Sequence, residues 1–91
     1  MAVHYKAKHI LLEEEDDVEY VMEKLNSGIS FEQLAKEFSS CDSSEKGGDL
    51  GRFPSGAMVP EFEKALFHMK IGEIKPGVRS KFGFHIILRE E

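Results

Sequence analysis

Two histidines and a single cysteine are the side chains of this sequence whose types and positions could carry chemistry. His9 lies within AKHILL and His85 within FGFHIIL, so each occupies an apolar segment. One histidine in a strand is usually a hydrogen-bonded core residue. Two can order each other, because the N–H of one ring can donate to the free nitrogen of the other. His4 and His68 lack such a setting, and we expect them to be at least partly exposed.

Cys41 has two interpretations. As a small buried hydrophobic residue it needs no function. As an active thiol it would need a nearby cation or helix end, and a thiol hydrolase would also need a third catalytic group and oxyanion donors, which the sequence does not identify. The cysteine and histidine spacing matches no metal site, so we expect neither a metal nor a cofactor.

The stretch around Cys41 is rich in glycine and carries apolar residues in a segment expected to be a loop. SSCDSSEKGGDLGRFPSGAMVPEF, residues 39–62, contains four of the eight glycines and two of the three prolines. Glycines let the backbone turn and approach another group closely, but a P-loop lysine is missing, so a nucleotide is not expected. We expect Phe53 in the core, and a small apolar pocket formed by Leu50, Met58, Phe62 and Phe82.

The elements that must position these residues follow from the hydrophobic pattern, in the order β-α-α-β-α-β-β. Strands are predicted at residues 4–12, 49–53, 77–80 and 83–89, with two helices after the first strand and one after the second. Because strands and helices do not alternate, we expect an α+β domain with helices on a small antiparallel sheet. The first and last strands should be central neighbours, which would place His9 and His85 opposite each other or diagonally across the ladder.

Capping residues and apolar stripes predict where the helices begin, end and pack. We expect the first helix to have Asp16 as its N-cap and to end at Gly28. The second helix is expected to begin with a capping box formed by Ser30 and Gln33. The third is expected to begin at Pro60 and to end at Gly72. The buried stripes are predicted to be Val18, Val21, Met22 and Leu25; Phe31, Leu34, Ala35 and Phe38; and Phe62, Ala65, Leu66 and Met69.

Size and charge limit the class of protein. The 91 residues predict a single domain spanning 1–91, and the net charge of −5 argues against nucleic acid or an anionic membrane as partner. One cysteine cannot form an intrachain disulfide. The sequence shows no signal peptide, and its apolar runs are shorter than the ~20 residues of a membrane helix. We therefore expect a cytoplasmic monomer.

Five segments in order, KAKHILL, FEQLAKEFSSC, GGDLGRF, GAMVPEFEKALF and SKFGFHIIL, resemble the signature segments of parvulin-type peptidyl-prolyl cis/trans isomerases. The resemblance covers residues 4–90. It implies a four-stranded antiparallel sheet surrounded by helices. It also implies an enzyme without a cofactor that rotates X–Pro bonds in unfolded or flexible polypeptides and so assists folding.

Carried over position by position, the resemblance makes His9 and His85 the paired histidines at the floor of the site. Cys41 falls where the family has cysteine or aspartate, and Ser80 where it usually has threonine. The residues implied to receive the substrate proline ring are Leu50, Met58, Phe62 and Phe82.

Other features depart from the family pattern. IKPGVRS, residues 74–80, reverses the usual order around its proline, which is expected to alter the entry into that strand. Residues 13–17 are five carboxylates, where phospho-selective members have a basic cluster, so we expect no preference for phosphorylated substrates. The alternative function is a peptide-binding or chaperone module that uses the same pocket without turnover.

Overall fold

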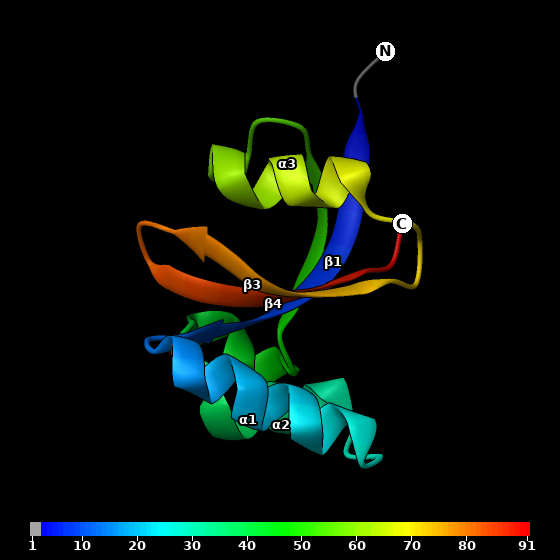
Figure 1. The fold of residues 1–91 in the computed structure, drawn as a ribbon. Coiled ribbons are helices and arrows are strands. Elements are labelled where there is room, and N and C mark those ends of the chain that lie inside the picture. The colour runs from blue at the N-terminus through cyan, green and yellow to red at the C-terminus, as the bar shows by residue number, and fades with distance from the viewer. Residues whose placement is uncertain (1–2) are drawn as a thin grey trace.

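The computed structural model describes residues 3–91, which form a four-stranded antiparallel sheet between two layers of helices (Figure 1). The α+β class and the element order are as predicted, with one additional 3₁₀ helix. The elements are β1 (His4–Leu12), α1 (Glu15–Asn26), α2 (Phe31–Phe38), η1 (Asp42–Lys46), β2 (Asp49–Pro54), α3 (Pro60–His68), β3 (Ile74–Ser80) and β4 (Gly83–Arg89). Within the described residues, no helix combines the length and apolar character needed to cross a membrane.

The strands lie in the order β2-β1-β4-β3, so the first and last strands are the central pair, as predicted. The strand β3 begins at Ile74, three residues before the predicted start, because Ile74 and Lys75 already pair with β4. The ladder then shifts register between Lys75 and Val78. Pro76 has no N–H to donate and Gly77 has a φ of 71°, so the unusual Pro-Gly order forms a bulge inside the strand.

Both faces of the sheet are buried, because α3 covers one face and α1 and α2 cover the other (Figure 1). Side chains alternate along β1, with Ala7 and His9 toward α3 and Ile10 and Leu12 toward α1 and α2. The α3-side cluster contains Tyr5, Ala7, Phe53, Phe62, Ala65, Leu66, Met69, Val78 and Ile87. The other cluster contains Ile10, Leu12, Val18, Val21, Phe31, Leu34, Ala35 and Ile86. Phe53 is therefore a core residue, as predicted.

Helix α1 begins earlier than predicted. Glu14 is its N-cap, with extended backbone and a carbonyl that accepts the Asp17 N–H, so the prediction of Asp16 as N-cap was wrong. Residues 15–17 instead place three carboxylates in the first turn, where they complement the positive end of the helix dipole. The helix ends as predicted, with Gly28 at a φ of 107° directly after the C-cap.

The caps of the other two helices match most of the predictions. The Ser30 side chain accepts the Gln33 N–H at the start of α2, and Pro60 opens α3. Phe38, predicted to be buried, is 37% exposed and packs edge-on against Tyr20. Helix α3 ends at His68 instead of reaching Gly72, and its buried stripe is as predicted.

Candidate active site

His9 and His85 come from the two central strands and meet through their side chains. In the β1–β4 ladder Leu11 pairs with His85, and His9 pairs with Ile87, so the histidines are diagonal neighbours, one of the two predicted arrangements. The two Nδ1 atoms are 3.0 Å apart, and the rings are tilted by only 19° with centroids 5.2 Å apart. One ring must therefore carry its hydrogen on Nδ1 and the other must accept it.

Ser80 extends this contact into a chain of three side chains. Its hydroxyl lies 2.7 Å from Nε2 of His85, and the Phe82 N–H donates to the same oxygen over 3.2 Å. Both nitrogens of His85 are thus engaged, one by His9 and one by Ser80. Nε2 of His9 has no hydrogen-bond partner within residues 3–91.

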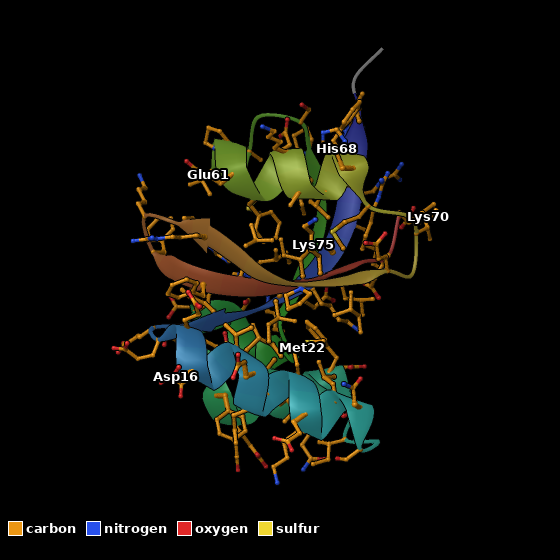
Figure 2. The ribbon with its side chains drawn as sticks, viewed as in Figure 1. Asp16, Met22, Glu61, His68, Lys70 and Lys75 are labelled. Atoms are coloured by element: carbon orange, nitrogen blue, oxygen red, sulfur yellow. The ribbon has the colours of Figure 1, made fainter. Side chains whose placement is uncertain are left out.

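Burial keeps the two rings neutral. His9 is 5% exposed and His85 3% exposed. Burial, reinforced by the charge that His85 would carry, lowers the pKa of His9 to about 4. Burial also lowers the pKa of His85, opposed by the carboxylate of Glu61, which stands at the start of α3 (Figure 2). At neutral pH the pair therefore offers polar atoms without a net charge.

Phe62 on α3 packs against both imidazoles and completes the floor of the site. Its ring meets His9 edge-on at 5.4 Å between centroids and His85 edge-on at 5.3 Å. These three rings lie at the bottom of a cavity of about 460 Å³ on the α3 side of the sheet. The cavity is lined by His9, Leu11, Cys41, Leu50, Ala57, Met58, Val59, Phe62, Phe82 and His85.

The segment between α2 and β2 is held against β1 by main-chain and side-chain hydrogen bonds. Ser39 Oγ accepts the Leu11 N–H, the Ser40 N–H donates to the Leu11 carbonyl, and the Gly48 carbonyl accepts the His9 N–H. The half-buried Cys41 is thereby brought to the same cavity as the histidines. Gly48 is needed at its position, because a Cβ there would lie 2.5 Å from the His9 carbonyl oxygen and its φ is 84°.

Residues 7–91 match the Rotamase family, described as the PPIC-type PPIASE domain. The chain belongs to this peptidyl-prolyl isomerase family, the parvulins. The predicted family is therefore confirmed.

Among relatives of this PPIC-type domain is "Foldase protein PrsA 2" of Bacillus anthracis, 52% identical over 89 residues. The aligned region is 92% of this chain and 31% of that foldase. "Foldase protein PrsA" of Oceanobacillus iheyensis is 52% identical over 83 residues, covering 90% of this chain and 28% of the relative. The chain therefore spans less than a third of the length of these two proteins.

Solved structures of parvulins share the fold. PrsA from Bacillus subtilis superposes with a TM-score of 0.90 at 44% identity, over 97% of this chain and 35% of that one. NmPin, the parvulin of Nitrosopumilus maritimus, superposes with a TM-score of 0.85 at 43% identity, over 97% of this chain and 96% of NmPin. The second comparison shows that a parvulin domain of nearly this length occurs on its own.

The structure brings seven of the eight predicted site residues of this parvulin domain into one cavity. The eighth, Ser80, does not line the cavity and reaches it only through its hydrogen bond to His85. Three lining residues were missed, namely Leu11, Ala57 and Val59. Two signals in the sequence could have found them. The alternation of side chains along the first strand places Leu11 on the same face as His9, and Ala57 and Val59 are the immediate neighbours of the predicted Met58.

The lining of the cavity is apolar apart from the two histidines of the floor and the thiol of Cys41. Residues 3–91 contain no group of three or more His, Cys, Asp or Glu side chains placed to hold a metal ion. Phe82 is 58% exposed and lies in the turn between β3 and β4, with the Lys81 ammonium 5.2 Å from its ring centroid. The site thus combines a buried floor of aromatic rings with walls of several origins. These are Leu11 on β1, Leu50 on β2, the segment around Cys41, the 55–59 loop and the β3–β4 turn.

Proposed function

We propose that this chain isomerises X–Pro peptide bonds in unfolded or flexible polypeptides and thereby assists protein folding. The observation that carries the proposal is the apolar cavity of about 460 Å³ above a neutral pair of histidines. The PrsA relatives, which are named foldases, support the folding role. The cytoplasmic location and the monomeric state remain predictions.

The reaction needs no bond to be broken. Resonance in the amide imposes a barrier of ~18–20 kcal/mol to rotation about C–N, and the enzyme must favour the twisted amide in which this resonance is lost. An apolar cavity suits that state, because the carbonyl loses charge separation as it rotates. Acceleration by about 10⁴ requires only about 5.5 kcal/mol of preferential binding.

We assign the grip on the proline ring to Leu50, Met58, Phe62 and Phe82. Phe62 forms part of the rigid floor, Leu50 and Met58 are half-buried in the walls, and Phe82 is largely exposed at the β3–β4 turn. Packing around the ring leaves the carbonyl side of the bond free to rotate. The four residues therefore bind the ring, and selection of the twisted amide falls to the polar atoms beside them.

The polar atoms are those of Cys41, His9 and His85, with Ser80 holding His85 in place. Preorganised dipoles stabilise a changed charge distribution without reorganising during the reaction. We propose that the neutral histidines and the thiol act in this way on the amide nitrogen or carbonyl. No covalent intermediate is involved, so Cys41 acts through its polarity.

A protease-coupled assay on a short Ala–Pro peptide tests the proposal. The protein should accelerate cis-to-trans isomerisation at substoichiometric concentration, and Met58→Ala should lower kcat/KM. Met22→Ala is the matched control, since Met22 is also half-buried but lies on α1, in the helical layer on the other side of the sheet (Figure 2). Binding of the peptide without acceleration would favour a peptide-binding module instead.

A further inference from the structure

The loop that carries one wall of the cavity is held by a single carboxylate from outside the cavity. Residues 55–59 connect β2 to α3 and supply Ala57, Met58 and Val59 to the cavity lining. The Ser55 hydroxyl donates to Oε2 of Glu63 over 2.8 Å, and the Gly56 N–H donates to Oε1 over 2.5 Å. One side chain of α3 therefore holds two consecutive residues of the loop.

Glu63 does not line the cavity. Its neighbour Phe62 lies in the floor, whereas Glu63 lines a separate hollow on the other flank of α3, together with Ser55, Pro60 and Phe67. The hydrogen bonds from Gly56 and Ser55 lower the pKa of Glu63, so the carboxylate is ionised and can accept both. Any effect of Glu63 on the reaction must therefore be transmitted through the loop.

The other contacts of this loop lie mainly at its two ends. At the α3 end, Met58 and Val59 pack against the α3-side cluster, and the Val59 carbonyl accepts the N–H groups of Phe62 and Glu63. The Ser55 N–H donates to the Val3 carbonyl and the Ala57 N–H to the Pro54 carbonyl. Within residues 3–91, no hydrogen bond from the N–H of Met58 or Val59 is found. Gly56 has a φ of 94°, and a Cβ added there would meet no atom within 4 Å, so close packing does not fix this residue. Its N–H is held by the hydrogen bond to Glu63.

We propose that Glu63 is a positioning residue that sets the width of the proline cavity by holding the 55–59 loop to the helix that carries Phe62. The floor residue Phe62 and the 55–59 loop of the wall are then both held by α3, so Met58 keeps a fixed separation from Phe62. Loss of the carboxylate releases the wall and weakens binding of the proline ring. The inference rests on the proposed isomerase function for its kinetic part only.

The experiment compares Glu63→Ala and Glu63→Gln with the control Glu23→Ala, an exposed glutamate on α1 on the other side of the sheet. With Glu63→Ala, KM for an Ala–Pro peptide should rise about fivefold with kcat nearly unchanged, because the wall contributes binding common to ground and transition states. Glu63→Gln keeps one acceptor oxygen and should show a smaller rise. Glu23→Ala should leave both constants unchanged.

Amide hydrogen exchange supplies a readout that general destabilisation would not imitate. The Gly56 amide should exchange at least about tenfold faster in Glu63→Ala, while the amides of Ile86 and Ile87 in β4 keep their protection. Ser55→Ala removes only one of the two hydrogen bonds to Glu63 and is therefore a milder change. It should also raise KM and accelerate exchange of the Gly56 amide. It keeps the test available if Glu63→Ala does not fold.

Several outcomes would overturn the inference. The first is that Glu63→Ala is active and its Gly56 amide exchanges faster, but its KM is unchanged. The second is that exchange of the Gly56 amide is the same in Glu63→Ala as in the wild type. A fall in kcat at unchanged KM would also overturn it. If the wild-type chain were inactive, the isomerase proposal would fail, and the affinity of each variant for the same peptide, measured by NMR titration, would still decide the role of Glu63.

Discussion

His9 and His85 share one hydrogen between their Nδ1 atoms, so each ring depends on the other for its tautomer and orientation. Phe62 contacts both rings and Ser80 holds the far nitrogen of His85. A change at either histidine is therefore felt at the other. The two rings therefore form one structural unit.

We predict that His9→Ala and His85→Ala each lower both stability and kcat/KM, and that their effects are less than additive. Removing one ring leaves the other without its partner, so the second removal costs less, with a coupling energy of about 0.5–3 kcal/mol. Urea unfolding and the coupled assay on both single variants and the double variant measure this. Full additivity in both quantities would show that the rings act independently.

Stability should depend on pH through His9, and through His85 in the same direction, because burial lowers the pKa of both rings. The pKa of His9 is about 4 in the folded chain and 6.5 when unperturbed, so between these values the unfolded chain takes up a proton that the folded chain does not. Stability is therefore complete above pH 6.5 and falls as the pH drops toward 4, by about 2 kcal/mol at pH 5.

Urea unfolding at several pH values tests this dependence. His9→Gln should make the profile between pH 6.5 and 4 shallower, and the slope that remains is assigned to His85. A profile that is equally steep without His9 would assign the dependence to other groups.

At the scale of elements, the segment from α2 to β2 packs its backbone directly against β1. Gly48→Ala would push a Cβ into the His9 carbonyl and displace the strand that holds the His9 imidazole. We predict a loss of about 3 kcal/mol of stability together with reduced activity. Gly72→Ala is the matched control, because Gly72 has a similar φ of 89° but a Cβ added there would have no atom within 4 Å. This substitution should cost only about 1–2 kcal/mol of stability.

The urea unfolding midpoints of the two variants separate the backbone strain of a non-glycine residue at positive φ from the close contact of the new Cβ with the His9 carbonyl. Equal losses for Gly48→Ala and Gly72→Ala would mean that backbone conformation accounts for the whole effect, and that close packing against His9 contributes nothing.

The start of α1 should influence which residue is accepted before proline. Glu13 and Glu14 precede the helix and residues 15–17 form its first turn, so five exposed carboxylates begin two residues after Leu11, which lines the cavity. We predict lower kcat/KM for phosphoserine or glutamate before proline than for alanine, with a difference that shrinks in salt because exposed charges are screened within ~10 Å at 0.1 M.

A peptide series varied only at that residue measures the preference. The basic residues Lys46, Arg52, Arg79 and Lys81 oppose it, but they lie on separate elements and Arg79 is engaged over the Phe84 ring. Glu13→Gln combined with Glu14→Gln should reduce the discrimination. A faster rate for phosphoserine–proline than for alanine–proline would contradict the prediction.

At the scale of the whole molecule, one sheet supports two hydrophobic clusters. Ile86 and Ile87 are consecutive on β4, both fully buried, and belong to opposite faces. Because the central strands β1 and β4 carry core residues of both clusters, neither layer can lose its packing without exposing a strand that the other needs.

We predict that Ile86→Ala and Ile87→Ala each cost about 2–4 kcal/mol and that each variant unfolds in a single transition. Far-UV circular dichroism, which follows the helices, and NMR signals from β1 and β4 should give the same midpoint. Separate transitions for helices and sheet in Ile86→Ala would mean that the α1–α2 layer unfolds on its own.

The elements were predictable from sequence because short-range patterns encode them. Period-2 alternation located β1 and β4 to the residue, and Ser30 and Pro60 marked the starts of α2 and α3 correctly. The prediction of Asp16 as N-cap failed because five consecutive acidic residues offer several equivalent starts. The end of α3 was missed because Arg89, about 20 residues further along the chain, donates to the carbonyls of Leu66 and Met69.

The sequence alone determined the family, through the resemblance of five segments to parvulin signatures. It also determined the fold class and the two histidines with their apolar partners, since these follow from residue types and local periodicity. Only the tertiary structure decided that the histidines meet through Nδ1 at a diagonal position, that burial keeps them neutral, and that Glu63 holds the wall from outside. Each of these depends on register, burial or the meeting of distant segments. Such quantities arise only when the chain is packed, because no local pattern specifies the distance between residues 76 positions apart.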